Sequence, residues 1–198
     1  LMLVAQAKFA ADKFLDKVLD DKLILPIYFE MLKKTTNIVL IGMPSSGKST
    51  LGDALSQHYT KELIDIDTVI ETNAKQTIPD LFSQYGEPYF RQLEHEAVLS
   101  SAQNTNCVIA TGGGSILNPD NVRALQQNGI LFFIDRDLDQ LETRGHRPLS
   151  KDRNTLEMMY EKRYPLYQKA AHVIVSNNGH IDEALSQIKE FYDEMFNS

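Results

Sequence analysis

The feature that most restricts the fold of this chain is a glycine-rich segment at residues 42–50, which reads Gly-Met-Pro-Ser-Ser-Gly-Lys-Ser-Thr. It matches the pattern G-x-x-x-x-G-K-[ST], which binds phosphate when it connects a buried strand to a helix. Residues 38–41 form an apolar run of strand length, and residues 49–58 have the spacing of a helix. The sequence therefore predicts a phosphate-binding loop in an α/β fold.

The residue types in this loop suit a nucleoside triphosphate. Gly42 and Gly47 allow backbone angles that direct successive N–H groups toward one anion, and the N-terminus of the next helix adds to the attraction. Lys48 is predicted to contact the β- and γ-phosphates, and Ser49 to offer a hydroxyl to Mg²⁺. The candidate nucleotide-binding residues of the loop are Gly42, Ser45, Ser46, Gly47, Lys48, Ser49 and Thr50. The alternative is a glycine-rich turn that only caps a helix, and the flanking strand and helix disfavour it.

Short apolar runs alternate with longer helical periods from residue 37 onward. The predicted strands are residues 38–41, 63–66, 107–110, 130–134 and 172–175. The predicted helices are residues 49–58, 87–102, 119–127, 154–169 and 181–196. This alternation predicts a three-layer α/β/α domain with a five-stranded parallel sheet. Ligands bind such sheets beyond the carboxyl ends of the strands, so we expect the site in the loops that follow residues 41, 66 and 110.

The composition limits the partners that this domain can bind. The 198 residues include 20 Lys and Arg against 27 Asp and Glu, and the net charge of −7 disfavours a non-specific nucleic-acid binder. A single cysteine, Cys107, excludes an internal disulfide framework. No uncharged stretch approaches the roughly 20 residues that a membrane span requires. We therefore expect a cytoplasmic, monomeric protein that binds neither nucleic acid nor membrane.

Two acids, Asp65 and Asp67, stand at the end of the second predicted strand. One carboxylate is needed to hold the water shell of Mg²⁺, and the other can accept the proton of an attacking hydroxyl. The alternative interpretation is that an Asp at a strand end forms a turn or caps a helix. Beside a phosphate-binding loop we favour the functional interpretation.

Glycine and arginine are concentrated in two further segments. Residues 111–114 read Thr-Gly-Gly-Gly, which lets backbone N–H groups approach a ligand closely, although a flexible loop is an equal alternative. Four of the seven arginines lie between residues 144 and 163, and Arg91 lies on a predicted helix. Arginine suits carboxylate and phosphate because its planar fork binds two oxygens at once. The polar segment at about residues 144–153 is predicted to form a mobile lid.

Taken in order, these segments resemble the shikimate kinase family from about residue 37 to the C-terminus. The matching segments are residues 42–50, the acids Asp65 and Asp67, Gly-Glu-Pro-Tyr-Phe-Arg at 86–91 with Glu94, residues 111–114, Arg-Pro-Leu at 147–149 and Arg-Tyr-Pro-Leu-Tyr at 163–167. The resemblance implies a P-loop kinase fold with a lid. It also implies that ATP phosphorylates the 3-hydroxyl of shikimate, giving shikimate 3-phosphate and ADP. This reaction is the fifth step of the pathway to chorismate and the aromatic amino acids.

The resemblance also implies a role for each matched position. Lys48 and Ser49 bind phosphate and Mg²⁺, and Asp65 holds the metal through water. Asp67 contacts the ring hydroxyls and orients or deprotonates the attacking one, within a substrate-binding region at 67–100. The other implied contacts are Arg91 and Arg163 at the shikimate carboxylate, Gly112, Gly113 and Gly114 along its ring, Arg147 of the lid at the transferring phosphoryl group, Arg144 at the adenine or phosphates, and residues 176–180 near the base. The implied catalytic residues are Lys48, Asp67 and Arg147.

Two other functions remain open at this point. One is a P-loop kinase for a different polyol, such as gluconate or a nucleoside, and the other is a shikimate-kinase-like module that binds without catalysis. The lid also departs from the family pattern, because only two residues separate Arg144 from Arg147. This shortening suggests altered lid closure or nucleotide release.

Residues 1–34 have no counterpart in the family pattern and precede a kinase domain at 35–198. Apolar residues at three- and four-residue steps predict an amphipathic helix at 4–21, followed by a short apolar run that Pro26 interrupts. We expect this extension to be accessory or introduced for expression, with Met31 as a candidate native start.

Overall fold

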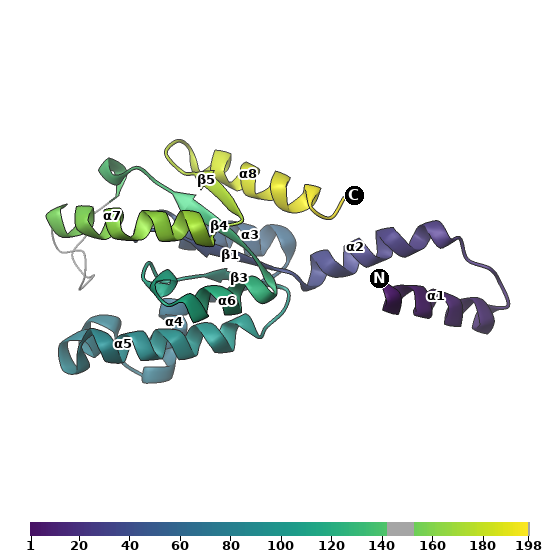
Figure 1. The fold of residues 1–198 in the computed structure, drawn as a ribbon, viewed down its shortest axis with the longest axis horizontal. Helices are drawn as coiled ribbons and strands as arrows, with labels where there is room; N and C mark the ends of the chain where they lie inside the picture. Colours follow the sequence, from purple (N-terminus) through teal and green to yellow (C-terminus); the bar gives the residue numbers. More distant parts are fainter. Residues whose placement is uncertain (142–152, 198) are drawn as a thin grey trace.

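The computed structural model describes residues 1–141 and 153–197 (Figure 1). The strands are β1 (Asn37–Ile41), β2 (Glu62–Asp65), β3 (Cys107–Ala110), β4 (Gly129–Asp135) and β5 (Val173–Ser176). The α-helices are α1 (Met2–Leu15), α2 (Ile24–Thr35), α3 (Lys48–Tyr59), α4 (Ile66–Ala74), α5 (Ile78–Ala102), α6 (Pro119–Gln127), α7 (Arg153–Ala170) and α8 (Ile181–Glu194). Short 3₁₀ helices η1 (Asp21–Leu23), η2 (Ser115–Leu117) and η3 (Leu138–Gln140) lie between them.

All five strands are parallel, and their order across the sheet is β2-β3-β1-β4-β5. Strand β1 lies in the centre, where Val39 pairs with Ile109 of β3 on one side and with Leu131 of β4 on the other. The loop that follows β1 therefore leaves the middle of the sheet, with a strand end on either side of it. The predicted α/β/α architecture with a five-stranded parallel sheet is confirmed.

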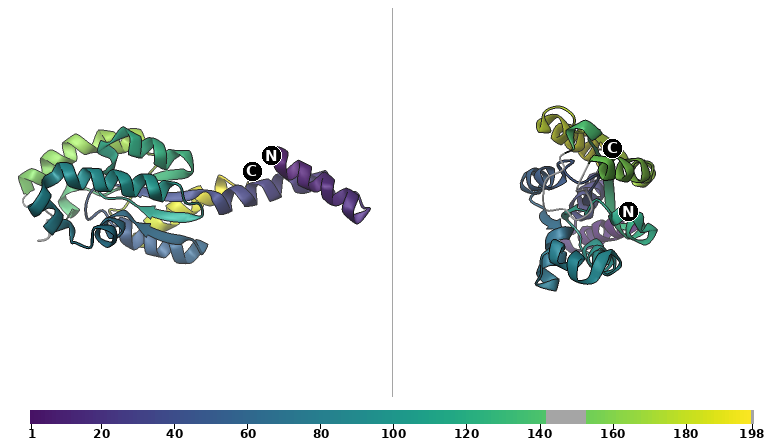
Figure 2. Two further views of the ribbon diagram at one scale, coloured as in Figure 1. Left: turned by 90° about the horizontal axis from the view of Figure 1, so that it is seen from below. Right: turned by 90° about the vertical axis from the view of Figure 1, so that its left-hand side faces the viewer.

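Alternate residues of the central strands face opposite sides of the sheet, and each side has its own core. Helices α4, α5, α6 and α7 pack on the face that carries Val39, Ile41, Leu131 and Phe133. Helices α3 and α8 pack on the other face, which carries Ile38, Leu40, Ile130 and Phe132 (Figure 1, Figure 2). Burial on both faces explains why these strands are continuous apolar runs in the sequence.

Two elements beside the site differ from the sequence prediction. Strand β2 ends at Asp65, and Ile66 begins α4 because Asp65 Oδ1 accepts hydrogen bonds from the N–H groups of Asp67 (3.0 Å) and Thr68 (3.3 Å). The helix predicted at 87–102 is the second part of α5, which is kinked at Gly86. Gly86 has φ 78° and ψ 175°, a conformation that glycine adopts readily.

Residues 1–35 form a helical arm, α1 and α2, that stands away from the sheet (Figure 1, Figure 2). The helix predicted at 4–21 is shorter than expected, because Asp16 adopts a left-handed conformation (φ 48°) directly after α1 ends at Leu15. Pro26 lies in the first turn of α2, where the missing N–H is not needed by the helix.

The arm is anchored to the domain where α2 meets β1. Lys61 Nζ donates to the carbonyl oxygens of Lys33 (3.1 Å) and Thr36 (3.0 Å), and the Tyr192 hydroxyl donates to the same two oxygens at 2.8 and 2.9 Å. These carbonyls lie at the end of α2, where the helix itself provides no partner.

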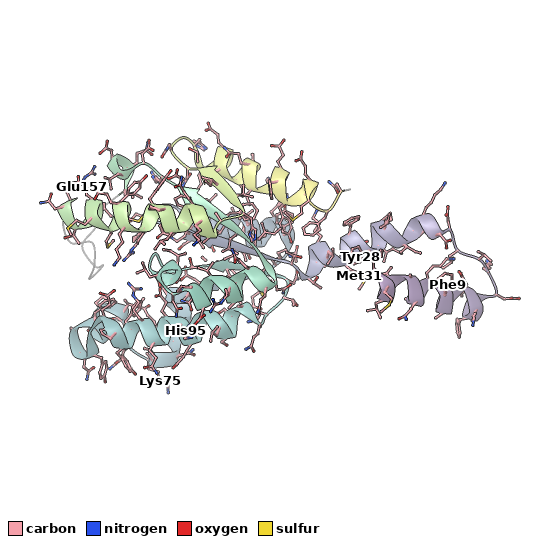
Figure 3. All side chains as sticks on the ribbon, viewed as in Figure 1. Phe9, Tyr28, Met31, Lys75, His95 and Glu157 are labelled. Carbon is pink, nitrogen blue, oxygen red and sulfur yellow. The ribbon has the colours of Figure 1, made fainter. Side chains whose placement is uncertain are left out.

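Beyond this junction, large apolar side chains of both arm helices are exposed. Phe9 of α1 and Met31 of α2 are 56% and 47% exposed and are labelled in Figure 3. Over residues 1–141 and 153–197, no helix has the length and apolar character needed to cross a membrane.

Candidate active site

The phosphate-binding loop connects β1 to α3 at the carboxyl edge of the sheet, and its two glycines are structurally required. Gly42 has φ 152°, and a Cβ there would lie 2.6 Å from the carbonyl oxygen of Ile134. Gly47 has φ 97°, and a Cβ there would lie 2.5 Å from Nδ2 of Asn177. Asn177 Nδ2 donates to the carbonyl oxygen of Ser46 at 2.7 Å, so the loop after β5 supports the phosphate-binding loop.

Lys48 and Ser49 begin α3 at the end of this loop. Lys48 Nζ donates to the carbonyl oxygens of Gly42 (2.9 Å) and Met43 (2.8 Å), which places the ammonium group over the loop. Ser49 Oγ donates to Asp65 Oδ2 at 3.1 Å. Asp65 therefore caps α4 with one oxygen, as the alternative interpretation expected, and presents the other oxygen to Ser49.

Asp67 lies in the first turn of α4 and lines the same cavity as Lys48, Ser49 and Asp65. This cavity has a volume of about 690 Å³, which is within the range of small-molecule sites. Gly113 lines it as well. The structure thus brings the phosphate-binding loop, both predicted acids and part of the glycine segment around one space.

The segment at residues 111–114 is closely packed, which contradicts the flexible-loop alternative. A Cβ on Gly112 would lie 2.7 Å from Glu94 Oε1 and 2.9 Å from Asp67 Oδ1. A Cβ on Gly114 would collide with the guanidinium of Arg91. Glycine is needed here because charged side chains from α4 and α5 occupy the space that a side chain would fill.

On α5, beside Gly114, the partly buried Arg91 pairs with the buried Glu94. Glu94 is 2% exposed and accepts from Arg91 Nη1 at 2.6 Å and from Ser115 Oγ at 2.8 Å. Glu87 pairs with Arg91 Nη2 at 2.9 Å on the exposed side. Burial alone lowers the pKa of Arg91, but the charges of Glu94 and Glu87 outweigh this effect, so the pKa is raised. Arg91 lines a neighbouring cavity of about 430 Å³ rather than the larger one.

Arg163 of α7 lies on the other side of the glycine segment. It is 6% exposed, and its Nη1 donates to the carbonyl oxygen of Gly113 at 3.0 Å, an oxygen that also accepts from the Tyr167 hydroxyl at 2.5 Å. Burial lowers the pKa of Arg163, and no carboxylate of the described residues forms an ion pair with it. Arg91 is balanced by Glu94 and Glu87, whereas Arg163 has no such partner among the described residues, so the positive charge of Arg163 is suited to a carboxylate ligand.

Some predicted residues fall outside the part of the chain that the structure describes. These are Arg144, Arg147 and the rest of the predicted lid up to residue 152. Arg153, predicted as the last residue of the lid, instead begins α7 and pairs with Glu157 at 3.0 Å.

Two residues had no assigned role in the sequence prediction. They are Glu94 and Arg136, and Arg136 lines a cavity of about 350 Å³ over the phosphate-binding loop. Asn177 was expected near the base with the rest of residues 176–180, and its contact with Ser46 was not predicted. Asn177 and Arg136 directly follow β5 and β4, and this position at the carboxyl edge was the signal that could have found them.

The central phosphate-binding loop, the strand order and the acids after β2 define a P-loop kinase fold with an acceptor cavity beside the loop. A family model described as shikimate kinase matches residues 44–193. The shikimate kinase of Clostridium botulinum (strain Alaska E43 / Type E3) is 42% identical over 157 residues, covering 77% of this chain and 94% of that protein. The chain therefore belongs to the shikimate kinase family.

Other relatives and solved structures agree with this assignment. The shikimate kinase of Clostridium beijerinckii is 38% identical, covering 77% of this chain and 92% of that protein. The structure of shikimate kinase from Acinetobacter baumannii in complex with shikimate matches with a TM-score of 0.76 at 28% identity, covering 84% of this chain and 96% of that one. The enzyme from Aquifex aeolicus matches with a TM-score of 0.71 at 31% identity, covering 80% and 96%.

Proposed function

We propose that this chain transfers the γ-phosphoryl group of ATP to the 3-hydroxyl of shikimate and releases shikimate 3-phosphate and ADP. The observation that carries the proposal is the single cavity lined by Lys48, Ser49, Asp65 and Asp67. Membership of the shikimate kinase family supports ATP and shikimate as the substrates. In this assignment the reaction is the fifth step toward chorismate and the aromatic amino acids.

On the donor side, the phosphate-binding loop and Lys48 stabilise the negative charge of the ATP phosphates. The backbone N–H groups of the loop and the N-terminus of α3 bind the phosphates, and Lys48 neutralises charge that builds on the γ-phosphoryl oxygens during transfer. Arg147 and Arg144, which lie outside the described residues, are proposed to contact the transferring group and the nucleotide.

Ser49 and Asp65 have the chemistry to hold Mg²⁺. Both offer oxygen, and their oxygens lie 3.1 Å apart. Among residues 1–141 and 153–197 no three or more His, Cys, Asp or Glu form a metal-binding group, and such a sparse set suits Mg²⁺, which keeps several waters and binds phosphates. Ser49 would bind the ion directly and Asp65 through water. When bound, the ion neutralises charge on the β- and γ-phosphates.

On the acceptor side, Asp67 accepts a hydrogen bond from the 3-hydroxyl and takes its proton. The hydroxyl oxygen forms a bond to the γ-phosphorus as the bond from that phosphorus to the bridging oxygen of ADP breaks. Arg91 and Arg163 bind the shikimate carboxylate, because both border the glycine segment and Arg163 has no ion-paired carboxylate among the described residues. Gly112, Gly113 and Gly114 line the ring.

We further propose that the enzyme acts in the cytoplasm and as a monomer. One copy of the chain supplies every described residue of the site, from α3, α4, α5, α7 and the loop after β3.

The test is ADP release in parallel reactions with shikimate, quinate, gluconate and nucleosides. ADP formation with shikimate alone is the expected result, and Asp67→Asn is the inactive control. ADP formation with gluconate or a nucleoside instead would contradict the proposal. Binding of shikimate without any ADP formation would favour a non-catalytic module.

A further inference from the structure

Arg136 directly follows β4 and lies beside the phosphate-binding loop. The cavity of about 350 Å³ over this loop is lined by Ser45, Ser46, Gly47, Lys48, Ser49, Thr50, Arg136 and Gln140. Arg136 is the one charged side chain among these that comes from outside the loop and α3. Its position is set by the sheet, because β4 pairs with the whole length of β1, from Asn37–Gly129 to Ile41–Phe133.

The guanidinium of Arg136 is partly buried, and one of its N–H donors is unpaired among the described residues. Its Nε is buried and has no hydrogen-bond partner among residues 1–141 and 153–197. Neither neighbouring acid is a hydrogen-bond partner of this Nε. Asp135 Oδ2 accepts from the Tyr164 hydroxyl at 3.0 Å, and Asp137 is exposed. A buried N–H group without an acceptor is unusual in proteins, and an anionic ligand is a natural acceptor for it.

Two cavities meet at the end of the phosphate-binding loop, where they share lining residues. Lys48 and Ser49 line both the 350 Å³ cavity and the 690 Å³ cavity that contains Asp67. The phosphoryl group that is transferred must lie between the donor and Asp67, at this shared boundary. The phosphates that remain in ADP then lie in the smaller cavity, to which Arg136 belongs and Asp67 does not.

We propose that Arg136 binds the diphosphate portion of the nucleotide, the α- and β-phosphate oxygens that ATP and ADP share. This inference rests on the proposed use of ATP. It makes Arg136 a binding residue for the donor, and it predicts a role distinct from that of Lys48, which acts on the transferred group. Arginine suits this role because its fork donates to two phosphate oxygens at once.

The experiment compares the affinities of ADP and inorganic pyrophosphate for the wild type, Arg136→Met and Arg136→Lys by calorimetry. We expect Arg136→Met to weaken both ligands by a similar factor of about 10 to 100, the usual range for one charge-assisted contact to phosphate. Arg136→Lys should recover part of the loss, because it restores the charge without the fork. The KM for ATP should rise by more than kcat falls. Arg123→Met, an exposed arginine on α6, is the matched control.

Two results would overturn the inference. One is an ADP affinity in Arg136→Met equal to that of the wild type. The other is a loss of ADP affinity with pyrophosphate affinity unchanged, which would place the guanidinium at the base. Shikimate affinity and thermal unfolding report whether the variant is folded. A wild-type chain that binds no ADP would contradict the proposed function itself, which is a different outcome from either of these.

Discussion

The nucleotide half of the site is built mainly from backbone, whereas the acceptor half is built mainly from charged side chains. Nine consecutive residues, 42–50, make the nucleotide loop, and its glycines are required because a Cβ there would collide with Ile134 or Asn177. The acceptor half draws on α4, α5, α7 and the loop after β3, and it is held by the Arg91–Glu94 pair and the packed glycines.

This difference leads us to expect that one half provides affinity for the phosphate donor and the other selects the acceptor. Backbone N–H groups bind any phosphate of suitable size, so the nucleotide half provides affinity and charge neutralisation for a donor that many kinases share. A fixed pattern of charges selects one acceptor, because a ligand that lacks the matching group leaves buried charges unpaired. Substrate specificity is therefore expected to reside in Arg91, Arg163, Glu94 and Asp67.

The largest expected effect is that of Asp67→Asn. Removing the general base should lower kcat by about 10²- to 10⁴-fold, because the asparagine amide cannot take the proton of the hydroxyl. ADP affinity, measured by calorimetry, should remain near that of the wild type, since Asp67 does not line the smaller cavity. Asp53→Asn, an exposed acid on α3, is the control. A near-normal kcat in Asp67→Asn would refute its role.

Lys48→Met is expected to have the next largest effect, from the nucleotide side. Loss of one donor to the developing charge should lower kcat by about 10²- to 10³-fold in a steady-state assay. Shikimate affinity should be retained, which would show that the nucleotide half does not determine acceptor binding. Lys75→Met removes an exposed lysine after α4 and should be neutral. An unchanged kcat in Lys48→Met would count against the assignment of the phosphate-binding loop.

The two acids that hold Arg91 allow a matched comparison within the acceptor half. Glu94→Gln removes the buried partner and should raise the KM for shikimate by about tenfold, the value of one hydrogen bond to a charged group. Glu87→Gln removes the exposed partner and should change it by less than about twofold. Kinetics at saturating ATP measure both. Equal effects would mean that burial of Glu94 does not position Arg91.

Removal of residues 1–30 is expected to have the smallest effect. The contacts that anchor the arm involve Lys33 and Thr36, which the shortened chain keeps. Because the arm touches none of the site residues described above, kcat should stay within about threefold of the full chain. Steady-state kinetics on both forms is the measurement. A large loss of kcat would mean that the arm supports the site.

The sheet was predictable from the sequence because each strand forms a distinct apolar run, and the three central strands, β1, β3 and β4, are buried on both faces. Helix α4 was missed because Ile66 continues the apolar run of β2, and only the cap made by Asp65 shows where the chain turns. The first part of α5 was missed because Gly86 and Pro88 are usually helix breakers, yet here they form a kink within one long element. Tertiary packing, rather than local backbone preference, determines where these helices begin.

The same contrast holds for the site. The nucleotide loop is contiguous, so its residues were found from a motif, and residues 45–50 line one cavity in the structure. Arg136 belongs to no motif, and Glu94 was matched to the family pattern without a role. The importance of each follows from what the fold places beside it: Arg91 and Ser115 beside Glu94, and the phosphate-binding loop beside Arg136. The glycines at 112–114 were expected to approach a ligand, but the structure shows that they also make room for Asp67, Glu94 and Arg91.

The division between the two halves is tested most directly by titrating Arg163→Met separately with shikimate and with ADP. Arg163 is buried, contacts the glycine segment and does not line the cavity over the phosphate-binding loop. The account predicts that shikimate affinity falls by about tenfold or more, the loss expected for a charge-assisted contact, while ADP affinity is unchanged. An equal loss of both affinities, or a loss of ADP affinity alone, would contradict it.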